Sequence, residues 1–335
     1  MAFSIRSPDE LVAVIPHMLG FQPEESLVFV PMRSELPVAR VDLPTTSRDT
    51  ELVWHSIRDG LTRYAHPGAA VGIVCFAADR QHAETLGREF AERLDTIGID
   101  THVLLWADET RWADLATGDM GLQTDAARER IAAMTVLSGR AQPAASREHL
   151  AESLVGDRDP VAKLLSETRA AASGNESMAE RRWALARMTR FQNDGVRLDD
   201  KDATRLLVAL EAIPTRDRLW LDMNRGNAAS HVALWTDLTR RAPDDVRAAP
   251  ASLLAFGSWL SGHGALAWCA LDQVPRGTPY TLARLVAAAI ETGMHPREWD
   301  AVKDAPAEDQ IGRASDLRRS PPNLQGGNVR PAPGI

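Results

Sequence analysis

The chain has little cysteine, and no apolar run in it is long. Only 2 of its 335 residues are cysteines, and these lie far apart without a Cys-x-x-Cys spacing. Isolated cysteines of this kind favour buried thiols in a reducing cytoplasm over a disulfide or a metal site. The longest apolar run, residues 69–78, is too short to span a bilayer. We therefore expect a cytoplasmic protein without a membrane segment.

Positive charge is also scarce, above all in the first part of the chain. The formal net charge is −8, and residues 1–124 alone carry −9. A negative surface repels phosphate backbones, so general nucleic-acid binding is not expected. Of the 38 basic residues, 35 are arginines. Because arginine binds carboxylates and phosphates through a planar fork, a local basic groove remains compatible with this composition.

Three motifs of common enzymes are missing. No strand-like run is followed by Gly-x-Gly-x-x-Gly or by Gly-x-x-x-x-Gly-Lys-Ser/Thr, and Gly-x-Ser-x-Gly does not occur. A dinucleotide site, a P-loop and a serine nucleophile elbow are therefore not expected. The length suggests about two domains, and 44% hydrophobic and 25% charged residues are ordinary values for globular chains.

The first half predicts an α/β domain over residues 1–138. A helix begins at Ser7-Pro8 and ends at Gly20, because serine caps, proline fits the first turn and glycine ends a helix. Strand-like runs follow at 26–30, 38–43, 70–76 and 101–106, with helical periodicity before each of the last two. We expect a mixed, mostly parallel sheet of about four strands, in which the runs 26–30 and 38–43 form a hairpin and one antiparallel hairpin strand is added to a parallel trio.

The second half predicts an all-helical domain over residues 146–311, after a boundary at 139–146. Residues 250–296 resemble a tetratricopeptide unit with an extra helix, since tryptophan, glycine, small residues and a closing proline follow one another there. A helical bundle that resembles a repeat is the alternative. Residues 312–335 lack apolar periodicity, and we expect them to form a disordered tail.

Several short segments of the chain form a recognisable set. They are SPDEL at 7–11, PHMLGFQPEESLV at 16–28, RVDLP at 40–44, RW at 111–112, LW at 234–235, AAP at 248–250, WLSGHGALA at 259–267 and YTLARL at 280–285. Together they resemble an actinobacterial family known as domain of unknown function 4192. The resemblance covers most of residues 5–300. It implies an architecture and an origin but brings no assigned activity.

Acidic residues follow three of the predicted strands. Asp42, Asp79 and Asp108 would meet at the carboxyl edge of a parallel sheet, where ligands usually bind. Carboxylate oxygens suit Mg²⁺, and Arg80 and Arg111 would then clamp a phosphate. This pattern indicates a divalent-metal hydrolase or phosphotransferase as one hypothesis. Solvated loops on an acidic domain are the structural alternative.

Three further residues are candidates for ligand binding, each with a structural alternative. Arg40 shares a strand face with Asp42, which indicates an ion pair or a ligand contact. His17 near the helix end is an acid–base candidate or a surface histidine. Trp112, six residues after Trp106, would wall a pocket or pack at a domain junction.

Taken together, these features favour a non-catalytic binding protein with a protein partner. The helical half would present the partner surface, and the metal-dependent enzyme is the competing hypothesis. Whether the protein is an enzyme is left open by the sequence.

Overall fold

The computed structural model describes residues 5–32, 36–137, 142–172 and 177–303. They form two compact units. The first contains the described residues up to His149 and the segment Ile290–Met294, and the second contains Leu150–Ala289 and the described residues from His295. The predicted boundary at 139–146 precedes this division, and the predicted tail lies outside the described residues. None of the described helices is long and apolar enough to cross a membrane.

The first unit is built on one mixed sheet of six strands, in the order β2-β1-β3-β4-β5-β6. The strands are β1 (Ser26–Pro31), β2 (Ala39–Asp42), β3 (Ala70–Phe76), β4 (Asp100–Ala107), β5 (Arg111–Asp114) and β6 (Met120–Leu122). Only β3 and β4 pair in parallel, and the other neighbours are antiparallel. The prediction of about four strands and a mostly parallel sheet is therefore wrong.

The sheet has fewer parallel pairs than predicted because of the position of β1. β1 and β2 form the predicted hairpin, and β1 lies between β2 and β3 and runs antiparallel to both. The chain then passes from β2 to β3 across β1. As a result, β2, β3 and β4 run in the same direction although β2 and β3 are not neighbours.

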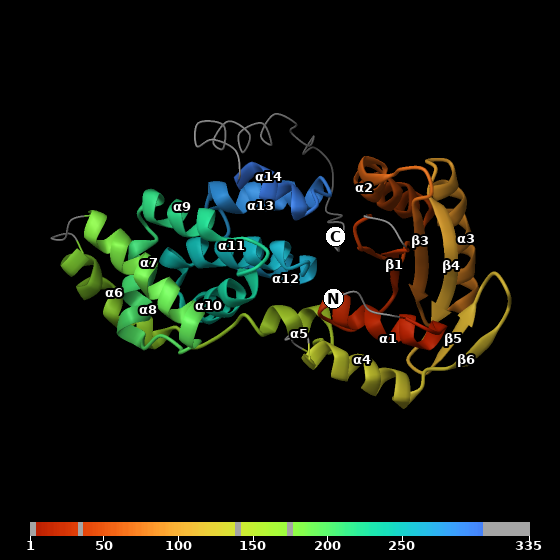
Figure 1. Ribbon diagram of the computed structural model, residues 1–335, viewed down its shortest axis with the longest axis horizontal. Coiled ribbons are helices and arrows are strands. Elements are labelled where there is room, and N and C mark those ends of the chain that lie inside the picture. Colours follow the sequence, from red (N-terminus) through yellow and green to blue (C-terminus); the bar gives the residue numbers. More distant parts are fainter. Residues whose placement is uncertain (1–4, 33–35, 138–141, 173–176, 304–335) are drawn as a thin grey trace. The chain divides into compact units, whose positions relative to one another are not determined.

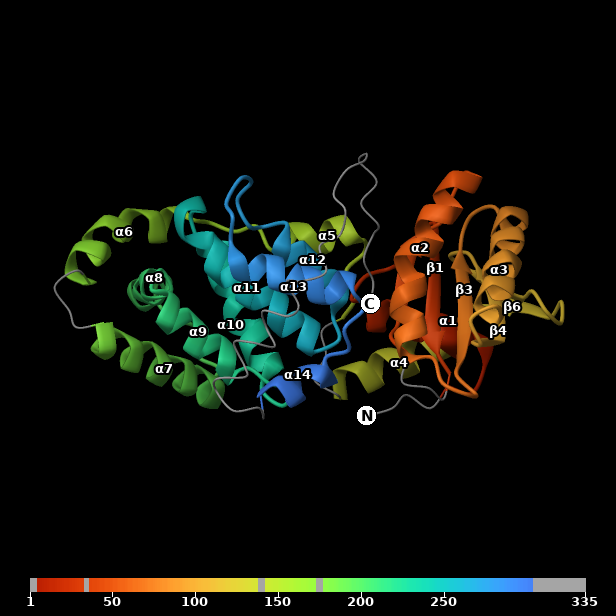
Figure 2. The same ribbon diagram turned by 90° about the horizontal axis from the view of Figure 1, so that it is seen from above.

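Helices cover both faces of the sheet, as Figures 1 and 2 show. Helices α2 (Ser47–Tyr64) and α3 (Arg80–Asp95) lie on one face, and α1 (Pro8–Leu19) and α4 (Asp125–Leu137) lie on the other. Two sequence signals at the ends of α1 are confirmed, because Pro8 is its first residue and Gly20 caps it in the left-handed conformation at φ 85°. Ser7 does not cap the helix with its side chain, and its hydroxyl donates to the Asp9 carboxylate instead.

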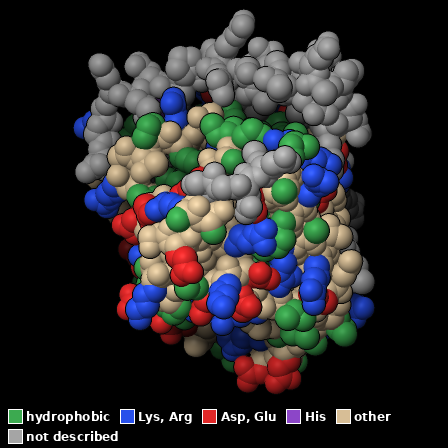
Figure 3. Space-filling model, turned by 90° about the vertical axis from the view of Figure 1, so that its left-hand side faces the viewer, with side chains coloured by type: hydrophobic (Ala, Val, Ile, Leu, Met, Phe, Trp, Pro, Cys, Tyr) green, Lys and Arg blue, Asp and Glu red, His purple; other side chains and the backbone are tan. Residues whose placement is uncertain are grey.

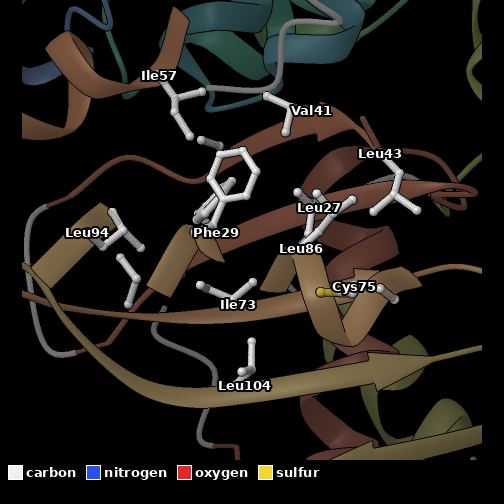
Figure 4. Close-up of a cluster of buried hydrophobic side chains, with 14 of the residues drawn as sticks. Leu27, Phe29, Val41, Leu43, Ile57, Ile73, Cys75, Leu86, Leu94 and Leu104 are labelled. Carbon is white, nitrogen blue, oxygen red and sulfur yellow. The ribbon is translucent and has the colours of Figure 1, made fainter. Parts of the chain in front are cut away.

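The core of the first unit lies between the sheet and helices α2 and α3. Figure 4 shows side chains from β1, β3 and β4 meeting side chains from the two helices. Phe90 of α3 is fully buried, with its ring centroid 5.8 Å from Phe29 and 6.4 Å from Trp54. Cys75 of β3 is also buried beneath α3, close to Gly87, where an added Cβ would lie 3.1 Å from the cysteine sulfur.

The second unit is helical. Its helices are α6 (Asp159–Ala172), α7 (Ser177–Asp194), α8 (Asp200–Ala209), α9 (Ile213–Asp222), α10 (Ala228–Arg241), α11 (Asp244–Leu260), α12 (Gly264–Leu271), α13 (Thr281–Glu291) and α14 (Arg297–Lys303); α5 (Arg147–Glu152) precedes them. Helix α10 packs against α11, and α11 against α12. Trp220 stacks on Trp299 at 5.1 Å, and Phe256 contacts both rings. Figure 3 shows a face of this unit on which basic, acidic and apolar side chains are interspersed. The likeness to tetratricopeptide hairpins remains a prediction.

An ion pair joins α1 to α4 on the second face of the sheet. Glu10 of α1 is buried, pairs with Arg130 of α4 and accepts a hydrogen bond from the Arg6 backbone N–H at 2.8 Å. These contacts hold the pKa of Glu10 below its ordinary value of 4.5. The pair therefore stabilises the fold when Glu10 is ionised.

We expect replacement of Phe90 by alanine to destabilise the first unit by about 3–5 kcal/mol, because the substitution leaves a cavity between the sheet and two helices. Urea unfolding followed by circular dichroism measures the change. Leu52→Ala, at an α2 side chain that is 44% exposed, is the matched control and should shift stability by less than about 1 kcal/mol. Equal effects of the two variants would contradict this account of the core.

The Glu10–Arg130 pair predicts a pH dependence of stability. Because the folded-state pKa is depressed, the stabilisation is present above the unfolded-state pKa near 4.5 and is lost as the pH falls through the folded value. Glu10→Gln should therefore lower the urea midpoint at pH 7 and make it vary less below pH 4.5. Asp125→Asn, at a largely exposed ion pair of α4, should leave the pH profile unchanged. Parallel profiles for wild type and Glu10→Gln would refute the role given to this pair.

Candidate functional site

The carboxyl ends of β2, β3 and β4 lie at the same edge of the sheet. The register aligns Asp42 with Ser26, Ser26 with Phe76, and Phe76 with Ala107, so four strands reach this edge in one row. The turns after β3 and β4 follow at the same edge. The sequence-based expectation of a common edge holds, although the sheet is not the predicted one.

The three carboxylates at this edge do not form a metal site. Among the described residues, no group of three or more His, Cys, Asp or Glu side chains is placed to hold a metal ion. Because β1 and β3 lie between β2 and β4, Asp42 and Asp108 are about 14 Å apart, from three strand spacings of about 4.8 Å. The predicted magnesium site at Asp42, Asp79 and Asp108 therefore has no support in the geometry.

Each of these carboxylates is instead used locally. Asp42 pairs with Arg40 at 2.6 Å. Asp79 caps α3 and accepts hydrogen bonds from the backbone N–H groups of Gln81 and His82. The Asp79 oxygens are therefore directed at the backbone N–H groups in the first turn of α3, and not at a point that they would share with Asp42 and Asp108.

Two arginines and one tryptophan at the ends of β3 and β4 do come together. The guanidinium carbons of Arg80 and Arg111 each lie 5.7 Å from the centre of the Trp106 ring. This distance is within the range of a cation–π interaction. Trp106 is 4% exposed, and its indole N–H donates to the Ala77 carbonyl at 2.9 Å. The ring is therefore fixed, and it holds both cations at one place. We call Arg80, Trp106 and Arg111 the arginine cluster.

The two cations of the arginine cluster differ in their partners. Arg111 donates from Nε and Nη2 to the Asp108 carboxylate at 2.9 and 2.7 Å. Burial alone would raise the pKa of Asp108, but hydrogen bonds from Thr110 and Arg111 outweigh it and lower the pKa. Arg80 forms no ion pair with a described carboxylate. Arg80 is therefore a cation at the edge of the sheet that pairs with no acidic side chain of the described part of the chain.

Trp112 does not line the same surface as Trp106. In the register Trp106 faces Ala113, whereas Trp112 faces Ala107 and Gly121. Because neighbouring residues of a strand point to opposite faces, the two tryptophan rings lie on opposite sides of the sheet. The hypothesis that Trp106 and Trp112 wall one pocket is therefore wrong.

Arg40 is a buried structural residue. It is 7% exposed, donates from Nε and Nη2 to Ser26 Oγ at 2.9 and 2.6 Å, and lies 5.6 Å from the centre of the Phe21 ring. Burial lowers the pKa of Arg40, and the Asp42 charge opposes this shift. Its contacts tie the end of α1 to β1 and β2. Phe21 also forms a β-bridge with Ala144, and no motif in the sequence indicated this contact.

His17 is also buried rather than solvent-exposed. It is 8% exposed, burial lowers the pKa of its ring, and Nδ1 forms no hydrogen bond with a described residue. A surface histidine is therefore not observed, and an acid–base role of His17 stays a prediction.

Glu25 was not among the predicted site residues, although it organises this edge. Its backbone has a positive φ of 39°, its carbonyl accepts from the Leu43 N–H at 2.7 Å, and its side chain accepts from the Ala78 N–H at 2.8 Å. Nothing in the Glu24-Glu25 pair distinguishes these residues in the sequence. The strained backbone joins the start of β1 to the ends of β2 and β3.

The fold and this edge together define a two-unit protein, in which an α/β unit carries the arginine cluster at one sheet edge and a helical unit follows. The model of a family described as domain of unknown function (DUF4192) matches residues 8–297. The chain therefore belongs to this family. No curated protein and no solved structure matches the chain.

We expect Arg40→Met to destabilise the first unit by about 1–3 kcal/mol, because it removes buried hydrogen bonds to Ser26. Asp42→Asn should change stability by less than about 1 kcal/mol, since the Asp42 side chain is 63% exposed. Chemical denaturation of both variants measures the difference. Wild-type stability in Arg40→Met would show that Arg40 is not needed for the fold.

Proposed function

We propose that this protein is a non-catalytic binding protein, and that the arginine cluster holds an acidic segment of a partner protein. The observation that carries the proposal is the pair of guanidinium groups fixed on one tryptophan ring. One of them, Arg80, is not compensated by a described carboxylate. A local cation of this kind on a chain of net charge −8 favours an anionic ligand.

The chemistry of the cluster favours carboxylates. Guanidinium groups bind carboxylates through two parallel N–H donors, and an aromatic ring beneath the guanidinium fixes the orientation of the fork. The Arg111 side chain is 64% exposed although it is paired with Asp108. The partner's carboxylate would therefore approach the cluster through Arg111, which it would share with Asp108, and contact the half-buried Arg80 beside it.

Two features support the remaining parts of the proposal. Both cysteines are buried free thiols, which is typical of proteins in a reducing cytoplasm. In the helical unit α10, α11 and α12 pack consecutively, and this arrangement suits a tetratricopeptide-like surface for the same partner.

The test is binding of a fluorescein-labelled oligoglutamate peptide to the full chain, measured by fluorescence anisotropy at low salt. Arg80→Ala should weaken binding about three- to tenfold, because it removes the uncompensated cation. Arg58→Ala, which removes an exposed arginine of α2, is the control of equal charge and should bind like wild type.

Three outcomes decide between the proposal and its failure. Weaker binding at higher salt is expected for a surface cation. Equal losses in Arg80→Ala and Arg58→Ala would show that only net charge matters, and would refute the site. Tighter binding of an oligothymidylate than of oligoglutamate would replace the acidic protein segment by a nucleic acid.

A further inference from the structure

A buried histidine lies inside the helical unit, and the proposed function does not use it. His231 of α10 is fully buried. Trp235, one turn further along α10, is also fully buried, and the two rings lie 26° from parallel with their centroids 6.3 Å apart. Because histidine changes its charge between about pH 5 and 8, a buried imidazole makes its surroundings sensitive to pH.

The contact with Trp235 determines where the proton of the neutral imidazole lies. The Trp235 indole N–H donates to His231 Nδ1 at 3.2 Å. An indole nitrogen is a donor only, so Nδ1 must accept and carries no proton. The neutral ring is therefore the tautomer with its proton on Nε2.

Gln192 of α7 lies beside the nitrogen that carries the proton. Its amide nitrogen is 3.1 Å from His231 Nε2. Two donors cannot share a hydrogen bond, so the amide is turned to present its oxygen, which leaves the shape of the side chain unchanged. The neutral form of His231 therefore bonds α7 to α10 and holds the ring of Trp235.

A carboxylate of a third helix is placed to receive the charged form. Asp222 Oδ2, at the end of α9, lies 3.8 Å from His231 Nε2. This distance is too long for a hydrogen bond, but a small rotation of a charged ring would close it to an ion pair. Among the described residues, Asp222 is the ionisable group that faces the imidazole.

In the part of the chain that the structure describes, the other helices packed on α10 bring no uncompensated charge to this place. Gly257 of α11 packs on the first turns of α10, and residues 248–260 of α11 are all uncharged. The loop before α6 packs on Arg240, at the far end of α10. On α7, Arg190 and Asp194 pair with each other.

We infer that His231 is a pH-responsive joint between α7 and α10. When Nδ1 takes up a proton from the solvent, its new N–H opposes the Trp235 N–H, and the ring moves. The Nε2–H then passes from the Gln192 amide to the Asp222 carboxylate. Acid therefore releases Gln192, and α7 is held less firmly in the helical unit. This inference is independent of the arginine cluster.

The two states of the joint exchange one strong interaction for another. The neutral state keeps the Trp235 indole bonded in the core, where a donor without an acceptor is costly. The charged state loses that bond and gains a charge-assisted one to Asp222, whose side chain is 42% exposed. The charge of the imidazole selects between the two states.

The first experiment identifies the tautomer of His231 in the full chain. Long-range proton–nitrogen NMR spectra of the imidazole, assigned by comparison with His231→Asn, should show the proton on Nε2 at about pH 7.5. A proton on Nδ1 would overturn the inference, because such a ring cannot accept from Trp235.

Hydrogen exchange then measures the response of α7. Deuterium uptake by α7, divided by the uptake of the unfolded chain at the same pH, should rise between about pH 7.5 and about pH 5.5. His231→Asn keeps an acceptor near the place of Nδ1 but takes up no proton, so its uptake should not change. His55→Asn, at an exposed histidine of α2, is the matched control and should respond like wild type. A wild type that does not respond, or an equal response in His231→Asn, would refute the joint.

Asp222→Asn tests the partner of the charged form, and it carries the test if His231→Asn does not fold. Without the carboxylate the charged ring loses its partner, so the midpoint of the change in α7 uptake should move about one pH unit lower. A purely structural Asp222 would leave the midpoint in place. An unchanged midpoint therefore rules out the exchange of partners.

Discussion

The position of β1 between β2 and β3 determines most of what the first unit presents at its surface. β1 pairs antiparallel on both sides, so its two neighbours must run in the same direction. Their carboxyl ends then join that of β4 at one edge. The hairpin register places Ser26 beside Asp42, so Ser26 accepts hydrogen bonds from Arg40 at this edge. The pairing of β1 with β2 and β3 therefore brings Arg40 to the same sheet edge as the turns that carry Arg80 and Arg111.

Electrostatics at this edge is governed by local pairing. Asp79 caps α3, and Asp42 pairs with Arg40 of the same strand. Asp108 accepts a hydrogen bond from the Arg111 N–H within its own turn. An acidic composition would suggest a field that gathers cations, but carboxylates that already accept several hydrogen bonds do not contribute to a common site. The unit carries excess negative charge and still exposes an uncompensated arginine where the ring of Trp106 holds it.

The elements with strong local signals could be predicted, and those that depend on tertiary pairing could not. α1 follows from Ser7-Pro8 and Gly20, and β3 from a continuous apolar run. An apolar run does not indicate its neighbours, so the pairing of β1 with β3 was not visible in it. β5 and β6 have four and three residues, too few for a periodicity to stand out. They exist because β5 pairs with β4.

The same distinction applies to the candidate site. Arg80 and Arg111 were correctly predicted to lie together, because this prediction needs only the common direction of β3 and β4. The metal site of three carboxylates was wrongly predicted, because the number of strands that separate the strand ends was not considered. Trp106 and Trp112 were also predicted to line one pocket. They are six residues apart, but the tight turn between β4 and β5 interrupts the alternation of side chains, so the two rings lie on opposite faces of the sheet.

The packing of α3 on β3 has a chemical consequence for the thiol beneath it. Desolvation raises the pKa of Cys75 to about 12, and the thiolate is the form that oxidants and electrophiles attack. Because a Cβ added to Gly87 would lie only 3.1 Å from the sulfur, α3 leaves little room beside the thiol for an added oxygen atom. Cys75 is therefore inert for as long as the unit is folded, and a modified Cys75 in a sample would record that the chain had opened.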